Sequence, residues 1–225
     1  MKIRCSAIGK IMTSPKLKGE LLSQTTKTYL LELAIAEKYG IHKEFSSRYT
    51  DKGNQVEELS IALCNDVLDL GFIYKNEDHF TNDWVKGTPD VNTDEILLDV
   101  KSSWDAFTFF EKVLDDDLKN KDYFYQLQGY LWITNKTEAL LCYCLIDTPL
   151  QIVEDEIRRE HWKANLIEES LDLRDFVQSK HTFGHIPKEK RLKTFKIAKD
   201  DITIEAIKTR IEECREYYDQ LIEML

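Results

Sequence analysis

Paired cysteines, glycine and proline are all scarce in this sequence of 225 residues. Its five cysteines are scattered, and none stands in the Cys-x-x-Cys spacing used by zinc sites and iron–sulfur clusters. We therefore expect reduced thiols and no cysteine-bound metal cluster. With only eight glycines and four prolines, collagen-like and linker-dominated architectures are excluded as well.

Long apolar runs and an excess of positive charge are also missing. No stretch approaches the roughly 20 apolar residues of a membrane-spanning helix, and the opening MKIRCSAIGKIMTSP lacks the apolar core of a signal peptide. We expect a cytoplasmic protein without membrane contact. The 41 acidic residues exceed the 31 lysines and arginines, for a net charge of −10. This balance argues against a non-specific nucleic-acid coat protein, but it is compatible with a nuclease that has a local basic groove.

The order of the expected helices and strands indicates an α/β fold with a small mixed β-sheet flanked by helices. Apolar residues at helical spacing predict helices at 6–12, 26–40, 53–70, 104–114, 122–134, 151–179 and 201–224. In the last of these, one apolar stripe is formed by Ile204, Ile207, Ile211, Cys214, Tyr218 and Leu221. Extended segments are expected at 79–82, 84–91, 96–101 and 138–146, with a hairpin turn at 92–94 and a loop-rich segment at 180–199. We expect one domain over 1–225, with a core at 1–149 and a mostly helical C-terminal extension at 150–225.

Two acids and a lysine stand at an informative spacing on the expected hairpin. Asp90 ends the first strand in GTPDV, while Asp99 and Lys101 lie in LLDVKSS on the second. Asp99 and Lys101 alternate with Val100, so their side chains share one face of the sheet, and the turn brings Asp90 close to Asp99. Two adjacent carboxylates repel each other unless a cation lies between them, and hard cations such as Mg²⁺ prefer oxygen ligands. With a lysine to orient or deprotonate water, this pattern indicates metal-assisted hydrolysis of a phosphodiester.

These residues carry a resemblance to a known nuclease superfamily. GTPD followed by DVK resembles the PD-(D/E)XK signature, and Glu57 in KGNQVEE is similar to that superfamily's helix glutamate. Gln126 and Tyr130 in QLQGY match its Q-x-x-x-Y helix. The opening RCSAIGKIM, with Ser6, resembles the start of the lambda-exonuclease-type, YqaJ-like viral recombinases. The blocks follow that family's order over roughly residues 1 to 146.

The resemblance implies a PD-(D/E)XK, restriction-endonuclease-like fold whose catalytic core is 1–149. Asp90, Asp99, Glu57 and the carbonyl of Val100 would bind Mg²⁺, for which Mn²⁺ would substitute. Lys101 would position or activate the attacking water.

The resemblance also implies roles for four residues around these ligands. Gln126 would orient Lys101 or a phosphate, and Tyr130 would support its helix or touch DNA. Ser6 would contact a terminal phosphate, and Arg4 is the candidate for an arginine that the lambda-type enzymes use near that phosphate.

Members of this family degrade linear double-stranded DNA 5′→3′ as a ring-shaped trimer. The resemblance therefore implies a homo-oligomer that acts on DNA ends, leaves a 3′ single strand for a single-strand annealing protein, and serves phage or prophage recombination. One alternative is an endonuclease or RecB-like nuclease module of the same superfamily. A second is a DNA-end-binding or interaction protein without turnover.

Several neighbouring residues compete for the same roles. Adjacent helix positions differ by about 100°, so either Glu57 or Glu58 faces the site, and the spacing from Gly53 favours Glu57. Gln128 competes with Gln126 and is a candidate DNA contact. In 180–199, seven lysines and arginines stand against a single acid. This island, with the candidate DNA contacts Lys188, Lys190 and Arg191, is interpreted either as a track for the DNA backbone or as a solvated loop.

Overall fold

The computed structural model describes residues 1–44 and 46–225 and has an α/β architecture with two mixed sheets. The larger sheet has the order β4-β5-β6-β7, formed by Val91–Asn92, Leu97–Ser102, Glu138–Cys144 and Leu192–Ala198. Its central pair, β5 and β6, is parallel, and the two outer pairings are antiparallel. The smaller sheet has the order β1-β3-β2, formed by Ile3–Arg4, Val85–Gly87 and Phe80–Thr81.

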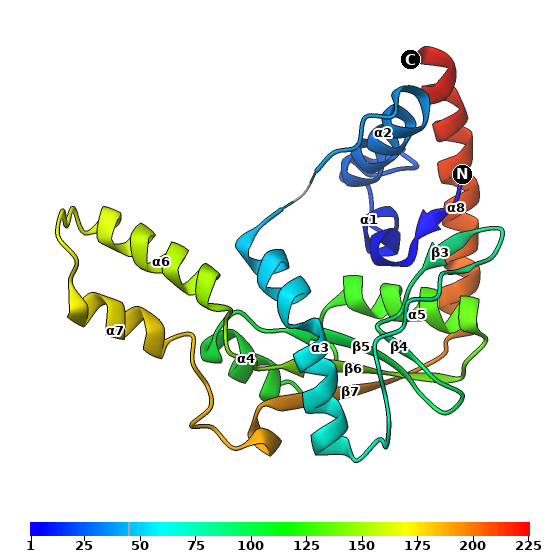
Figure 1. The fold of residues 1–225 in the computed structure, drawn as a ribbon. Coiled ribbons are helices and arrows are strands. Elements are labelled where there is room, and N and C mark those ends of the chain that lie inside the picture. Colours follow the sequence, from blue (N-terminus) through cyan, green and yellow to red (C-terminus); the bar gives the residue numbers. More distant parts are fainter. Residues whose placement is uncertain (45) are drawn as a thin grey trace.

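Helices surround both sheets. They are α1 (Ile8–Ile11), α2 (Gln24–Tyr39), α3 (Arg48–Leu68), α4 (Ala106–Val113), α5 (Lys121–Thr134), α6 (Leu150–Lys163), α7 (Leu171–Ser179) and α8 (Asp201–Met224), with the 3-10 turns η1 (Cys5–Ala7) and η2 (Lys188–Lys190). Ser47 caps α3 and Asn120 caps α5, each accepting a hydrogen bond from an N–H of the first turn. Figure 1 shows α2 beside α8 at one end of the molecule, while α6 and α7 form an arm (residues 150–179) that projects from the opposite side.

The faces of the larger sheet are buried against different helices because successive strand residues point in opposite directions. Leu98 and Val100 of β5 lie in one apolar cluster with residues of α3. Leu97 lies in another cluster, together with residues of α5 and α8. The sheet is thereby enclosed between α3 and α5, which places the intervening Asp99 and Lys101 on the α5 side.

The predicted apolar stripe of the last helix is confirmed. The six residues of the stripe are all buried in α8. Five of them, all but Ile204, pack in the same cluster as residues of α1 and α2 from the start of the chain. The two ends of the chain therefore share one core. In the described part of the chain, no helix has both the length and the apolar composition needed to cross a bilayer.

Two expectations about the chain after residue 149 are corrected. The helix predicted at 151–179 is divided into α6 and α7, because the chain turns at Asn165, which has a left-handed φ of 54°. The segment 180–199, expected to be loop-rich, contains β7, which pairs with β6 along its whole length. The lysines of β7 obscure the apolar pattern of a strand in the sequence. The alternation of the strand nevertheless buries Phe195 in the core.

In the hairpin expected at 84–101, the strand that pairs with β5 is shorter than predicted. Pro89 has no N–H to donate to a ladder, and it separates β3, which joins the smaller sheet, from β4. The turn itself is confirmed, since Val91 pairs with Leu98 and Asn92 with Leu97. Continuing this register by one residue brings Asp90 opposite Asp99.

Candidate active site

The shortness of β4 explains the position of Asp90. Beyond Leu98, β5 has no strand partner on the β4 side, so the N–H of Val100 is left for another acceptor. Oδ2 of Asp90 accepts it at 2.7 Å. The carbonyl of a strand residue points to the same edge as its N–H, so the Val100 carbonyl faces the Asp90 side, as a metal ligand there requires.

Asp99 and Lys101 form an ion pair beside Asp90. The side chain of Asp99 is 1% exposed and that of Lys101 is 22% exposed, and Lys101 Nζ lies 2.5 Å from Asp99 Oδ2. The ammonium also lies 5.0 Å from the ring centre of Tyr123 on α5. Lys101 therefore has its stem enclosed and its charged end at an opening.

The electrostatics of this group depend on two carboxylates and one ammonium. Burial raises the pKa of Asp90 to about 7, and repulsion by Asp99 adds to this, while Lys101 and the Val100 N–H oppose it. Burial by itself would lower the pKa of Lys101, but attraction to Asp99 and Asp90 outweighs it, so the pKa is raised. Lys101 is thus a cation held between the two carboxyl groups.

Helix α3 supplies the opposite wall. Glu57 faces the cleft, together with Gly53 and Asn54 one turn earlier, and its carboxylate pairs with Lys75 at 2.9 Å. Glu58 is exposed and does not line the cleft. Of the two competing glutamates, Glu57 therefore faces the cleft, as the spacing from Gly53 predicted, and Glu58 does not.

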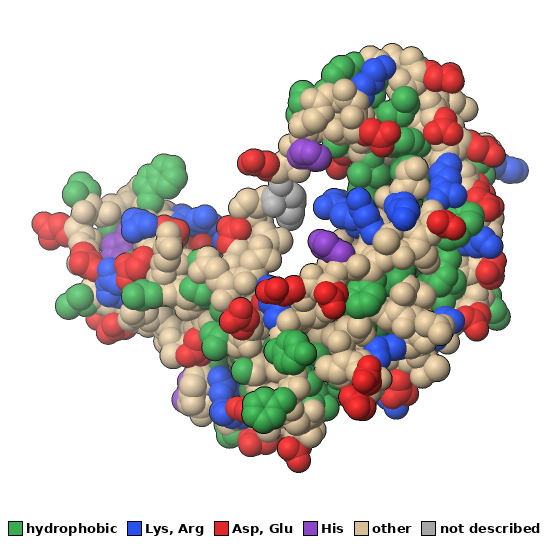
Figure 2. Space-filling model, turned by 45° about the vertical axis from the view of Figure 1, so that its right-hand side comes forward, with side chains coloured by type: hydrophobic (Ala, Val, Ile, Leu, Met, Phe, Trp, Pro, Cys, Tyr) green, Lys and Arg blue, Asp and Glu red, His purple; other side chains and the backbone are tan. Residues whose placement is uncertain are grey.

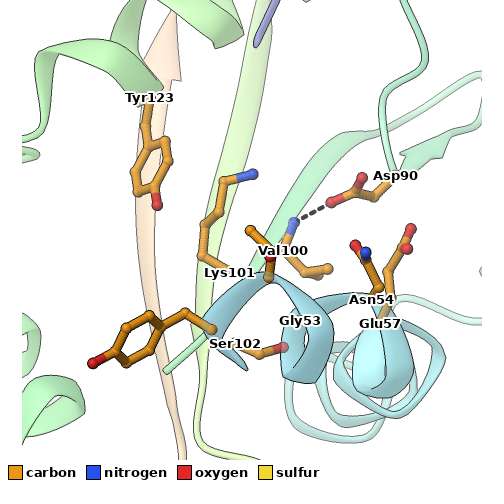
Figure 3. A pocket seen from close by; sticks show the side chains of 10 residues that line it. Gly53, Asn54, Glu57, Asp90, Val100, Lys101, Ser102 and Tyr123 are labelled. Atoms are coloured by element: carbon orange, nitrogen blue, oxygen red, sulfur yellow. Dashed lines mark hydrogen bonds between the residues drawn. The ribbon is translucent and has the colours of Figure 1, made fainter. Parts of the chain in front are cut away.

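These side chains surround one cleft of about 360 Å³. Figure 3 shows Asp90, Lys101 and Glu57 converging on it from the β4 edge, β5 and α3, with the hydrogen bond from Val100 to Asp90 drawn as a dashed line. Tyr49, Thr50, Ser102 and Tyr123 complete the lining.

Those four residues were missed in the sequence. One signal was present for Tyr49, because Tyr49, Gly53 and Glu57 follow each other at intervals of four and therefore share one face of α3. No local pattern indicated Tyr123, which reaches the cleft from α5.

Gln126 and Tyr130 lie one helical turn apart on α5, behind Asp99. The amide of Gln126 donates to Asp99 Oδ1 at 3.2 Å and to the hydroxyl of Tyr130 at 3.0 Å. Gln126 therefore contacts the carboxylate that pairs with Lys101, and its expected role of orienting Lys101 or a phosphate stays a prediction. Tyr130 contacts Gln126 one turn along the same helix, and its two expected roles, support of the helix or contact with DNA, stay predictions.

Gln128 is not a DNA contact. It is fully buried, its amide donates to the carbonyl of Ala198 at 2.8 Å, and its oxygen accepts from the N–H of Asp200 at 2.8 Å. It joins α5 to the connection between β7 and α8. The reason is rotational, since two positions along a helix turn the side chain by about 200°, away from the face of Gln126.

Arg4 and Ser6 line a second hollow, of about 700 Å³. Both are exposed, and they share this hollow with Lys86, His79 and Tyr130. Tyr130 is thus the link between this hollow and Asp99. Figure 2 shows one face of the molecule hollowed, with lysine and arginine side chains gathered on one side of the hollow and acidic side chains on the other.

The basic segment 180–199 lies elsewhere. Lys188 pairs with Asp66 near the far end of α3, nine residues or about 13 Å along the helix from Glu57. Lys196 pairs with Glu138 on β6. Lys188, Lys190 and Arg191 are absent from the lining of both hollows, so the placement favours the solvated-surface interpretation over the DNA track.

The donor set at Asp90 and Asp99 fits a hard divalent cation. Asp99 Oδ2 is buried, and its one near partner in the described residues is the ammonium of Lys101 at 2.5 Å. Two adjacent carboxylates and a carbonyl on the same edge are the oxygen ligands that Mg²⁺ uses. In the described residues, no group of three or more acidic, histidine or cysteine side chains is gathered closely enough to ligate an ion. Glu57 in particular is engaged by Lys75.

Comparisons with known proteins agree with this geometry. No family model and no curated protein matches the chain. A solved phage-related exonuclease from Haemophilus somnus 129PT is 29% identical, with a TM-score of 0.77 over 100% of this chain and 96% of its own. An alkaline exonuclease from Laribacter hongkongensis is 15% identical, with a TM-score of 0.67 over 99% of this chain and 90% of its own. A structure of that enzyme in complex with dAMP, 17% identical, has the same TM-score and coverage.

The two structures of the Laribacter hongkongensis enzyme support the fold. The Haemophilus somnus structure adds a likeness in sequence over the full length of the chain. With Asp90 and Lys101 at one cleft and Asp99 buried beside them, the likeness to the phage-related exonuclease supports a nuclease enzyme. The chain resembles, along its whole length, the lambda-exonuclease-type, YqaJ-like nucleases of the PD-(D/E)XK superfamily.

Proposed function

We propose that the chain is an exonuclease that hydrolyses phosphodiester bonds at the ends of linear double-stranded DNA, in the 5′→3′ direction. Mg²⁺ would be its cofactor, and Mn²⁺ would substitute. The observation that carries the proposal is that Asp90 and Lys101 line one open cleft, with the buried Asp99 paired to Lys101 beside it. The full-length likeness to named exonucleases supports the end-directed activity.

The charged residues of the cleft have distinct parts in the proposed reaction. Asp90, Asp99 and the Val100 carbonyl would hold the cation, with Glu57 on the opposite wall. A bound Mg²⁺ supplies a water of lowered pKa and neutralises charge on the scissile phosphate. The ammonium of Lys101 would donate hydrogen bonds to the attacking water or to a phosphate oxygen, and Gln126 would keep the carboxylate of Asp99 in place.

The second hollow would receive the terminal phosphate. Arg4 and Lys86 offer positive charge there, and Ser6 offers a hydroxyl donor. Because Tyr130 lines this hollow and contacts Gln126, a phosphate bound there would lie next to the metal site. This arrangement would select 5′-phosphorylated ends.

The likeness to the lambda-exonuclease type also supports proposals about assembly. We expect a cytoplasmic homo-oligomer, a trimeric ring, that passes its 3′ single strand to an annealing protein during phage-type recombination. Sedimentation of the purified chain tests the trimer.

The activity is tested with linear, 5′-phosphorylated duplex DNA beside closed circular DNA, in Mg²⁺ and in Mn²⁺. The wild type should shorten only the linear DNA, and Lys101→Ala should abolish this while DNA binding persists. Lys196→Ala, which removes a surface lysine on β7, is the matched control and should retain activity. Labels at the 5′ or 3′ terminus report the direction.

Other outcomes would redirect the assignment. Cleavage of circles would indicate an endonuclease. Binding of DNA ends without cleavage in either metal would indicate a non-catalytic end-binding protein.

A further inference from the structure

Tyr49 presents an aromatic ring to the catalytic cleft. It belongs to the first turn of α3 and lines the same cleft as Asp90 and Lys101. The residue is 53% exposed, so a ligand in the cleft can reach it. Neither the metal site nor the lysine uses it.

The ring of Tyr49 is held in place from behind. Trp104 meets it edge to face, with ring centres 5.0 Å apart and planes at 73°. The guanidinium of Arg48 lies 4.9 Å from the ring centre and donates to the hydroxyl at 2.9 Å. Arg48 is itself fixed by two hydrogen bonds, of 2.9 and 2.7 Å, to the carboxylate of Glu156 in the arm.

A ring held this way loses little conformational freedom when a ligand stacks on it. Its two supports leave part of its surface open toward the cleft. The position is also suited to a DNA strand, because Tyr49 and Glu57 lie on one face of α3, about 12 Å apart along the axis. That length corresponds to a few nucleotide steps at about 3.4 Å each.

We propose that Tyr49 is a stacking surface for a nucleobase near the DNA end bound in the cleft. The inference rests on the proposed nuclease function and adds a residue that holds the strand without reading its sequence. Every base has a π-face, so stacking on an aromatic side chain tolerates all four bases. The charged groups of the cleft would bind phosphate, while Tyr49 holds the base.

The test uses duplex ends that carry one abasic nucleotide at each of the first few positions in turn. For the wild type, one position should lower the rate of digestion by about tenfold, the size of a lost stacking contact. Tyr49→Leu should lower the rate on intact DNA by a similar factor and show no further loss at that position. Tyr49→Phe keeps the ring and should behave like the wild type.

A second measurement does not require cleavage. 2-Aminopurine is placed at each of the first few positions in turn, and its fluorescence at one of them should be quenched when the wild type binds in EDTA, and less so with Tyr49→Leu. Tyr39→Ala is the matched control, because Tyr39 is a tyrosine of nearly equal exposure, 52%, outside the cleft. Equal melting temperatures of the variants confirm that they fold.

Two results would overturn the proposal: an abasic penalty that persists undiminished in Tyr49→Leu, or equal quenching by both proteins. If the wild type binds DNA but cleaves none, the proposed catalysis fails while the quenching still decides the stacking. If the wild type binds no DNA, both fail together.

Discussion

The backbone N–H of Val100 donates a 2.7 Å hydrogen bond to the carboxylate of Asp90. The carboxylate of Asp90 takes the place of a strand partner of β5, because β4 does not extend past Val91 toward the cleft. The bond holds Asp90 next to Asp99 despite their repulsion, and it depends on an oxygen acceptor but not on a charge.

Asp90→Asn should therefore separate folding from metal binding. The amide oxygen can still accept from Val100, and the loss of repulsion should leave stability in EDTA equal to or above that of the wild type. Saturating Mg²⁺, at about 100 times its dissociation constant, should stabilise the wild type by about 2.7 kcal/mol and the variant much less. The loss of several kcal/mol of charge stabilisation predicts a drop in activity of about a hundredfold or more.

Thermal unfolding with and without Mg²⁺ measures this effect. Asp94→Asn, in the turn after β4, is the control and should keep the full Mg²⁺ response. An equal response in Asp90→Asn would show that Asp90 is not a ligand.

Gln126→Leu should lower the affinity for Mg²⁺, although Gln126 is not itself a proposed ligand. The substitution removes the donor to Asp99 Oδ1, and losses of such supporting contacts typically cost 10- to 100-fold in metal affinity or activity. The Mg²⁺ concentration for half-maximal rate should rise accordingly. Tyr130→Phe keeps the bond from Gln126 to Asp99 and should produce a smaller shift. An unchanged Mg²⁺ dependence in Gln126→Leu would exclude this role.

Gln128→Leu should destabilise the fold and spare the chemistry. It leaves the carbonyl of Ala198 and the N–H of Asp200 without partners, each at a cost of about 1–3 kcal/mol if it stays dry. Urea unfolding should show a loss of about 2–5 kcal/mol, with normal digestion well below the melting temperature. Loss of DNA affinity at unchanged stability would instead restore the DNA contact expected from the sequence.

Lys52 should make stability depend on pH. It is buried and donates to the carbonyl of Trp104 at 2.9 Å. Burial lowers the pKa of Lys52 from 10.5 to about 8, with Asp105 and Asp147 opposing the shift. Between these values the unfolded chain binds more protons than the folded one, so the Lys52 contribution to stability increases as pH rises.

The comparison with Lys52→Met isolates this effect, because the other groups titrate alike in both proteins. From about pH 7.5 to pH 10.5, the difference in unfolding free energy should change by about 3 kcal/mol in favour of the wild type. A difference that stays constant over this range would show that the lysine is not desolvated.

Local periodicity was enough to predict the parts of the fold that are decided within one element. The alternation in LLDVK places Asp99 and Lys101 on one face of β5, and the stripe of α8 follows from helical spacing alone. The choice of Glu57 over Glu58 is of the same kind, since it depends on the direction of a side chain around one helix axis. In each case, the deciding interaction lies within a few residues.

The assembled site depends on contacts between distant segments. Asp90 faces Val100 because Pro89 ends the ladder and β4 is short, Gln126 reaches Asp99 because α5 packs on β5, and Gln128 turns to Ala198 across the core. Tyr49 is fixed through Arg48 by Glu156, more than a hundred residues later in the chain. The hydrophobic effect is non-directional, so a sequence pattern indicates which residues are buried but not which residues they contact. The packing of whole helices and strands determines those contacts.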